Sequence, residues 1–543
     1  MTRRLASSLD RSLAPALAPA LAPALAPALA PALAPALAPA LAPALAPALA
    51  PALAPALAPA LARALMGPLS LALALSGGAG APRAHAAGLE FPESGAAAAM
   101  RGGAAVSGVT DPTAAFLNPG VLSRLKGLRL TYNHNIIESA ISFTRAPSQI
   151  PATDLSAPFD GTVGRAPASN ETPWFFLNGL LAVSHDFGTP FTFAASVYGP
   201  NSGGSARYDV SGGQRYMMTS LDGLLAFAGL SVAYGGESWG VGVTGQYAMM
   251  PEMTYRMVVD GQPYTSELNP YEGAFDVEAE VRVSDMFAYS AIVGAWVRPL
   301  PNLEVAASGR VLPVRFNATG SVAVLNTPTG QTYSPEQLTI TGGGASFDLT
   351  LPPTARLGVR YRGLEETGAE GEEARERFDV ELALVYEAWH MMNQLNVDLQ
   401  GSVALFASPL SPVVIEKRWR DTLSARLGGT YRLTDTLALS AGGFYEQGAT
   451  PKQYAHIDFP SFDRFGASGG LTLSAPGGLE LLLGYLHIFE SGVTVSEAEA
   501  KVLQQRPIRP CPDLCDGYTG VPANAGRLTA SFRSVSIGLR AGF

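Results

Sequence analysis

The end of the chain alternates apolar residues with polar or small ones at every position. From residue 535 to residue 543 the odd positions are apolar, and the even positions are serine, glycine or arginine. Successive side chains of a strand point to opposite faces, so this pattern predicts a strand with two different surroundings. In a membrane barrel the two surroundings are lipid and lumen.

The same alternation recurs upstream in segments of about 9 to 11 residues, which is the length of one membrane-crossing strand. Examples are residues 239–247, 355–362, 423–432 and 464–473. A soluble sandwich shares the period, but the arginines on the inner phase disfavour it. We therefore predict an all-β fold, a closed antiparallel transmembrane barrel of 14 strands.

The connections between these strands alternate between short and long. Short ones such as 188–190 resemble periplasmic turns, and long ones such as 251–285 and 317–352 resemble external loops. The segment 363–377 is long although it falls on the short side, and it contains six glutamates. We expect a solvated periplasmic excursion there, with a lost strand pair as the alternative.

Residues 1–86 are expected to be processing sequence rather than fold. Proline occurs at every fourth position from Pro15 to Pro59, which prevents a hydrogen-bonded helix and indicates low complexity. An apolar stretch and the triplet Ala84-His85-Ala86 follow, in the order of a secretory signal. A start site further downstream is the alternative.

Composition narrows the class of protein. The chain has 543 residues, is 47% hydrophobic and 15% charged, and carries a formal net charge of -9, so nucleic acid is a poor partner. No run of 18 or more apolar residues follows the signal. Export combined with lipid-compatible strands predicts a multi-pass protein of a Gram-negative-type outer membrane.

The segment 87–126 does not have the pattern of a membrane strand and is a candidate plug, with the barrel at 127–543. This segment contains Arg101-Gly102-Gly103-Ala104, Asp111-Pro112-Thr113-Ala114 and the stretch from Phe116 to Gly120. In these residues the sequence resembles the FadL/TodX family of outer-membrane transporters of long-chain fatty acids and other hydrophobic molecules. The Asn-Pro-Ala hatch motif of the family falls on Asn118, Pro119 and Gly120, with glycine replacing alanine.

This resemblance implies a lumen closed by the hatch and passive, ligand-gated diffusion with sideways exit. It implies capture between the loops 251–285 and 317–352, and a pocket near the mature N-terminus, which contains Leu89 and Phe91. It also implies a break in the third strand at Gly199 and Pro200. Proline independently marks a point where strand pairing fails, because it lacks the amide hydrogen.

Other candidate sites have less specific patterns. Arg356, Arg360, Arg426 and Arg464 share the inner phase, and one or two of them could bind a fatty-acid carboxylate while most pair with lumen acids. Cys511 and Cys515 are a candidate local disulfide in an exported protein. His487, near Ser491, could belong to a lipid hydrolase, but an aromatic-belt position is the favoured interpretation.

We thus expect a monomeric transporter, not an enzyme, that binds a hydrophobic small molecule, contacts outer-membrane lipid and uses no cofactor or metal. The alternatives are a porin for polar solutes, which would conduct ions steadily, and an outer-membrane lipid hydrolase.

Overall fold

The computed structural model describes residues 94–146, 168–170, 174–200, 204–260, 276–327, 332–334, 336–365, 375–405, 408–409, 413–505 and 522–543. The expected leader 1–86, Leu89, Phe91, Cys511 and Cys515 lie outside these ranges. Within them, no helix combines the length and the hydropathy that a bilayer crossing requires.

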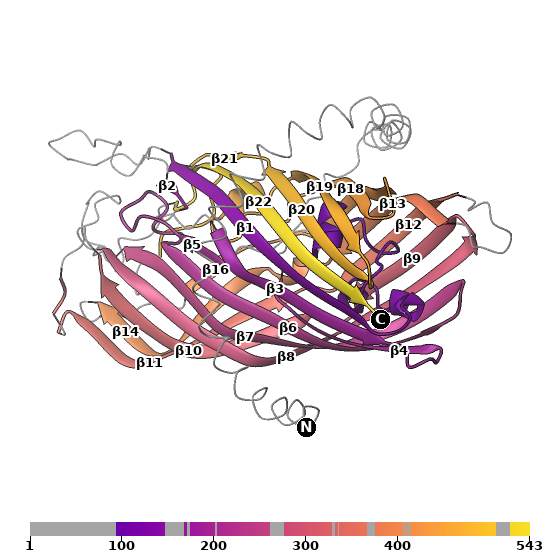
Figure 1. Ribbon diagram of the computed structural model, residues 1–543. Helices are drawn as coiled ribbons and strands as arrows, with labels where there is room; N and C mark the ends of the chain where they lie inside the picture. Colours follow the sequence, from indigo (N-terminus) through magenta and orange to yellow (C-terminus); the bar gives the residue numbers. More distant parts are fainter. Residues whose placement is uncertain are drawn as a thin grey trace, which may run out of the picture. The chain divides into compact units, whose positions relative to one another are not determined.

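The strands form one antiparallel sheet that closes on itself (Figure 1). Closure occurs because β1 (Arg129–Arg145) pairs along its whole length with β22 (Gly526–Gly542) and, on its other edge, with β3 (Trp174–His185). Going round from β3, the wall continues through β4 (Phe191–Tyr198) with β5 (Ser205–Arg207), β6 (Ser220–Gly235), β7 (Trp239–Asp260), β8 (Asp276–Leu300), β9 (Leu303–Arg310) with β10 (Val314–Asn326), β12 (Thr354–Glu365) with β11 (Leu338–Leu351), β13 (Arg375–Glu387) with β14 (Gln394–Leu405), β17 (Thr422–Arg432) with β16 (Val413–Glu416), β18 (Leu437–Glu446), β19 (Arg464–Ala475) and β20 (Leu479–Glu490). Counting each joined pair as one crossing, the described residues give the 14 strands that the sequence predicts.

The remaining elements are short. They are β2 (Ala168–Ser169), β15 (Ser408–Pro409), β21 (Val493–Val495), η3 (Trp389–Met391), η4 (Lys452–Tyr454) and the helices of the N-terminal segment, α2 (Ala96–Met100), α3 (Ala114–Leu117) and η1 (Pro119–Arg124). In Figure 1 the indigo N-terminal segment lies inside the wall, near the C-terminus.

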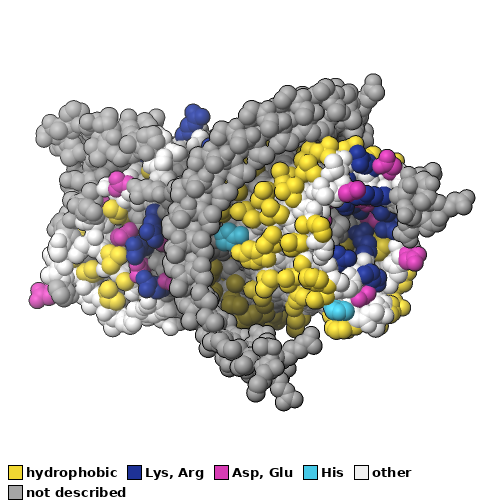
Figure 2. All heavy atoms as spheres, viewed as in Figure 1, with side chains coloured by type: hydrophobic (Ala, Val, Ile, Leu, Met, Phe, Trp, Pro, Cys, Tyr) yellow, Lys and Arg dark blue, Asp and Glu magenta, His cyan; other side chains and the backbone are white. Residues whose placement is uncertain are grey.

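Near the short turns, the wall has an apolar outer face and a polar inner face. In β12, for example, Leu357, Val359 and Tyr361 are exposed, whereas Gly358 and Arg360 are buried toward the lumen. Figure 2 shows the apolar side chains as a broad band across the outer wall, with charged side chains gathered on either side of it. We call this part of the wall the belt region. Its outer face suits hydrocarbon, as predicted.

Beyond the belt the same strands reverse their amphipathic pattern. The segments β10, β11, β14 and β16, which we call the cap sheet, direct apolar residues inward and polar residues outward. In β11, Phe347, Leu349 and Leu351 are buried, while Asp348 is exposed. A carboxylate that points outward is stable in water but costs much free energy in hydrocarbon. The reversal therefore marks the level at which the wall leaves the membrane.

The reversal corrects one expectation. The segments 251–285 and 317–352 are not simply loops, because β7 continues to Asp260, β8 begins at Asp276, and β10 and β11 occupy most of the second segment. The belt alternation stops at the expected length, but strand pairing does not. In contrast, β12 and β13 do pair, out to Glu365 and Arg375, so no strand pair is lost around the glutamate-rich segment.

Candidate functional site

Residues 94–125 occupy the lumen of the belt region and are called the hatch here. The helix α2 ends in a pair of bonds from Gly102 N to Ala99 O at 3.1 Å and from Gly103 N to Ala98 O at 2.9 Å. Both glycines have positive φ, 62° and 77°, which glycine adopts without steric cost. The chain therefore turns sharply directly after Arg101.

Arg101 fastens the hatch to the barrel wall. Its guanidinium donates to both carboxylate oxygens of Asp379 on β13, at 2.9 and 2.6 Å, and to Thr430 on β17 at 3.0 Å. Arg360 of β12 binds the same carboxylate at 2.9 Å. Such two-pronged arginine–carboxylate pairs are among the strongest protein hydrogen bonds.

Two buried glutamates of the wall hold the hatch backbone. Glu381 accepts hydrogen bonds from the amides of Val106, Ser107 and Gly108 at 2.7, 2.8 and 2.8 Å. Glu304 binds Arg124 at 2.8 Å. A cavity of 330 Å³ adjoins this network on the short-turn side and is lined partly by charged residues. The contacts of the hatch with β12, β13 and β17 are therefore polar and ion-paired.

The expected motif Asn118-Pro119-Gly120 lies where the hatch touches β8. The fully buried Asn118 donates through Nδ2 to Val106 O at 2.9 Å and to Ala295 O at 3.1 Å, while its Oδ1 accepts from Gly120 N. A Cβ on Gly120 would come within 2.7 Å of the carbonyl oxygen of Gly294. This close approach explains why glycine replaces alanine in the motif.

The hatch also reaches the expected break in the third strand. β4 ends at Tyr198, and the pairing with β6 resumes only at Ser205 of β5, while Gly199 N still donates to Gly179 O of β3 at 3.2 Å. Lateral opening at Gly199 and Pro200 stays a prediction. Ser94 Oγ donates to Gly199 O at 3.1 Å, and the ring of Phe116 stacks on Tyr198 with centroids 4.2 Å apart. The start of the described hatch is thus bonded directly to the place where the wall is interrupted.

The candidate arginines of the inner phase all lie on the lumen side. Arg360 pairs with Asp379 and with Glu304 at 3.0 Å, and Arg464 and Arg426 share Glu446 at 2.5 and 3.4 Å. Arg356 is half-buried on β12. Three of the four therefore already have carboxylate partners in the wall, and carboxylate binding at these residues stays a prediction.

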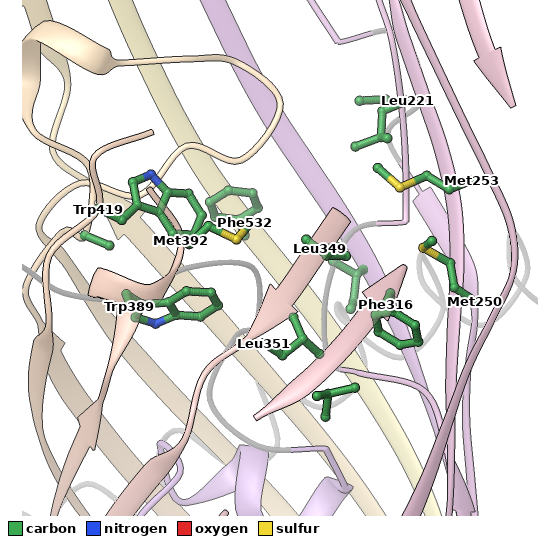
Figure 3. Packing of buried hydrophobic residues seen from close by; sticks show 14 of the residues in the cluster. Leu221, Met250, Met253, Phe316, Leu349, Leu351, Trp389, Met392, Trp419 and Phe532 are labelled. Carbon is green, nitrogen blue, oxygen red and sulfur yellow. The ribbon is translucent and has the colours of Figure 1, made fainter. Parts of the chain in front are cut away.

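Above the hatch the lumen is apolar. Side chains of β6, β7, β10 and β11 face those of the links around Trp389 and Trp419 and of β22 (Figure 3). All of them belong to one buried apolar cluster, which also reaches hatch residues such as Phe116 and Leu122. The part of the cluster above the hatch is called here the apolar interior, and it includes Leu221, Met250, Met253, Phe316, Leu349, Leu351, Trp389, Met392, Trp419 and Phe532. An interior of this kind offers an apolar solute a lower free energy than water.

A charged pair lies among these apolar groups. The Lys417 ammonium contacts both Asp458 carboxylate oxygens at 2.6 Å, and His456 Nδ1 lies 2.8 Å from the same carboxylate. Burial lowers the pKa of both Lys417 and His456. Burial would raise the pKa of Asp458, but His456 and Lys417 outweigh it and hold that pKa well below its ordinary value. The pair ties the segment 447–463 to the end of the cap sheet.

The wall has a second interruption between β8 and β10. Their pairing stops at Ser284–Thr319, and β8 pairs again only from Ile292, with Arg310 of β9. Large apolar side chains surround this stretch on the outside, and Met286, Phe287 and Tyr289 are 53%, 71% and 67% exposed. An apolar surface therefore lies at the base of the two segments expected to capture ligand.

The apolar interior is the functional feature that the sequence reasoning missed. Its signal was present, since residues 345–351 alternate apolar with polar as regularly as any belt strand. The alternation was not recognised because it continues beyond the length of a membrane crossing. The contact of Lys417 with Asp458 had no sequence signal, because the two residues are 41 positions apart.

Comparison with known proteins defines the class. The sequence pattern of the outer membrane protein transport protein family (OMPP1/FadL/TodX) matches residues 78–511. The chain therefore belongs to this family of outer-membrane transporters of hydrophobic compounds, and it is a transport protein rather than an enzyme. Among curated protein sequences, none matches this chain.

Solved structures show the same fold. A Pseudomonas aeruginosa FadL homologue is similar with a TM-score of 0.63 and 17% identity, covering 84% of this chain and 100% of that one. The Pseudomonas putida toluene transporter TodX has a TM-score of 0.56 and 13% identity, covering 84% of this chain and 99% of that one. The Ralstonia pickettii toluene transporter TbuX has a TM-score of 0.53 and 11% identity, covering 83% of this chain and 99% of that one.

Proposed function

We propose that this protein takes up hydrophobic small molecules by passive diffusion, through the apolar interior and sideways past the hatch into the membrane. The observation that carries the proposal is the reversal of the wall, which gives an apolar interior on one side of the hatch, while the ion pairs between the hatch and the wall lie on the short-turn side. An apolar solute gains free energy by entering the interior. It would lose free energy by continuing down among Arg101, Asp379 and Glu381.

The proposed route begins at the apolar surface around Phe287 and ends at the interruption after Tyr198. Exit there is supported by the gap in the pairing with β6 between Tyr198–Phe227 and Ser205–Asp222, and by the bond from Ser94 to Gly199 O. A shift of the hatch start would break this bond and leave the interruption uncovered. In this mechanism Asn118, Pro119 and Gly120 keep the rest of the hatch in place while its start moves. Transport of toluene by similar structures supports an apolar ligand, and a long-chain fatty acid is another candidate.

A matched pair of variants tests the route. Phe316→Asp places a charge in the apolar interior. Its neighbour Asn317 is exposed on the outer face of β10, so Asn317→Asp places the same charge outside the interior. Uptake of radiolabelled oleate and of radiolabelled toluene is measured in cells that lack their own transporter. We expect uptake of at least one solute to be lost in Phe316→Asp and kept in Asn317→Asp, with equal amounts of barrel in the outer membrane.

A second experiment addresses gating and the porin alternative. Replacing both Asn118 and Pro119 with alanine should reduce uptake without removing the barrel from the membrane, because Val106 O and Ala295 O lose their donor. In planar bilayers the unaltered protein should show no large constant conductance. Steady conductance of the unaltered protein, or unaltered uptake by the double variant, would contradict the proposed gate.

A further inference from the structure

Two buried polar groups next to the charged pair have no hydrogen-bond partner among the described residues. They are the indole N–H of Trp419 and the hydroxyl of Tyr208, whose residues are 3% and 6% exposed. Both residues belong to the apolar cluster that forms the interior. An indole nitrogen can only donate. A buried donor without an acceptor costs about 1–3 kcal/mol, so a ligand that supplies an acceptor would recover this energy.

Trp389, which packs against Trp419, has an indole N–H with a hydrogen-bond acceptor. Trp389 and Trp419 meet edge to face with ring centroids 5.1 Å apart. Trp389 Nε1 donates to Glu387 at 2.8 Å, whereas the nitrogen of Trp419 lies on the ring edge that faces away from Trp389 (Figure 3). The protein therefore supplies an acceptor to one indole of the pair and none, within the described residues, to the other.

Three buried cations around the interior are each held by a wall carboxylate. Lys417 is held by Asp458 at 2.6 Å, Arg215 by Asp276 at 2.8 Å, and Arg464 by Glu446. A ligand carboxylate would lose its hydration on entering, and at any of these three cations it would have to displace the wall carboxylate. A neutral acceptor avoids that cost, and a plain hydrocarbon leaves the Trp419 N–H unsatisfied.

We infer that the preferred ligand is a neutral hydrophobic molecule carrying one accepting oxygen, such as a long-chain alcohol or ketone, whose oxygen accepts from Trp419 Nε1. This inference rests on the proposed function and specifies its substrate class. Tyr208 is the second donor that a ligand oxygen could reach. The residue that determines specificity is Trp419, through a single hydrogen bond.

The test compares three ligands of equal chain length, decane, decanol and decanoate. Binding is measured by displacement of a fluorescent apolar probe from the full-length protein in lipid nanodiscs, because many detergents carry accepting oxygens themselves. Empty nanodiscs correct for partition into lipid. We expect decanol to bind about tenfold more tightly than decane or decanoate, which corresponds to one recovered hydrogen bond.

Three phenylalanine variants assign the hydrogen bond. Trp419→Phe removes the N–H but keeps an aromatic ring. The affinity for decanol should therefore fall to that for decane, while the affinity for decane is unchanged. Trp389→Phe is the control, because its N–H is already bound to Glu387, and it should leave the preference for decanol intact. Tyr208→Phe should likewise leave most of the preference intact.

The outcomes separate the inference from the proposed function. Equal binding of decane and decanol, tightest binding of decanoate, or loss of the preference in Tyr208→Phe instead of Trp419→Phe would each overturn the inference. Absence of binding by all three ligands would count against the proposed function itself. The ligand series on the unaltered protein stands on its own if the Trp419 variant does not fold.

Discussion

The belt region and the cap sheet are built from the same strands and have opposite faces buried. In the eighth crossing, Leu357, Val359 and Tyr361 of β12 face outward, whereas Phe347, Leu349 and Leu351 of β11 face inward. Pro352 and Pro353 separate the two segments. The medium outside the wall determines which face is apolar, because apolar side chains have lower free energy against hydrocarbon and polar side chains have lower free energy against water.

The filling of the two regions differs as well. The belt lumen is occupied by the hatch, which the wall binds through buried carboxylates such as Asp379 and Glu381. The cap lumen is filled by apolar side chains around a small number of paired charges. The hatch is thus bound to the wall by ion pairs on one side and borders the apolar cluster on the other. One chain thus combines the core of a membrane barrel with that of a water-soluble sheet.

The largest expected effect comes from breaking the ion network of the belt. Arg101→Met leaves Asp379 and Glu381 buried with less compensation, which should weaken hatch docking by about 3–5 kcal/mol. The barrel itself should still assemble, and ionic conductance in planar bilayers should rise. The control is Arg375→Met, which breaks the exposed pair with Asp435 and should leave conductance unchanged. A closed channel in Arg101→Met would show that the network does not hold the hatch.

A lysine scan along one crossing should sharpen the boundary between the two regions. Val359→Lys puts a charge into lipid and should cost about 2–4 kcal/mol of barrel stability. Thr350→Lys lies on the outward phase of β11 and should change stability by no more than about 0.5 kcal/mol. Unfolding in urea from lipid vesicles measures both. Equal costs would mean that the membrane extends beyond the proline pair.

A smaller effect is expected from acidification of the cap. Burial lowers the pKa of His456 in the folded protein below that of an unfolded imidazole, which is about 6.5. The unfolded state therefore binds more protons below that pH, and cap stability should fall as the pH drops from about 7 to about 5. The low pKa of Asp458 adds a further loss only below about pH 4, where an unfolded aspartate becomes protonated.

Tryptophan fluorescence can follow this change, because Trp389 and Trp419 lie in the cap. The groups that face His456 are Lys417, Asp458 and, through Asp458, Tyr208 and Tyr255. His456→Gln removes the titrating imidazole, so the change between about pH 7 and about pH 5 should disappear while the loss at lower pH remains. A change that persists in this variant would assign the effect to another group.

The sequence by itself determined the belt. Alternation with period two divided the residues of each strand between two faces, and the length of the alternating segments predicted the membrane crossings. The motif around Asn118 led to the prediction of a hatch before the first strand. These features are local, because each depends on neighbours within a few residues along the chain.

Only the tertiary structure determined which residues meet inside the lumen. Arg101 meets Asp379 across 278 positions, and Lys417 meets Asp458 across 41. The sequence pattern of residues 345–351 shows two faces without saying which one is buried, because alternation is symmetric between inside and outside. Closure of the barrel and the level of the membrane break this symmetry, and they turn what had been interpreted as a loop into the wall of an apolar interior.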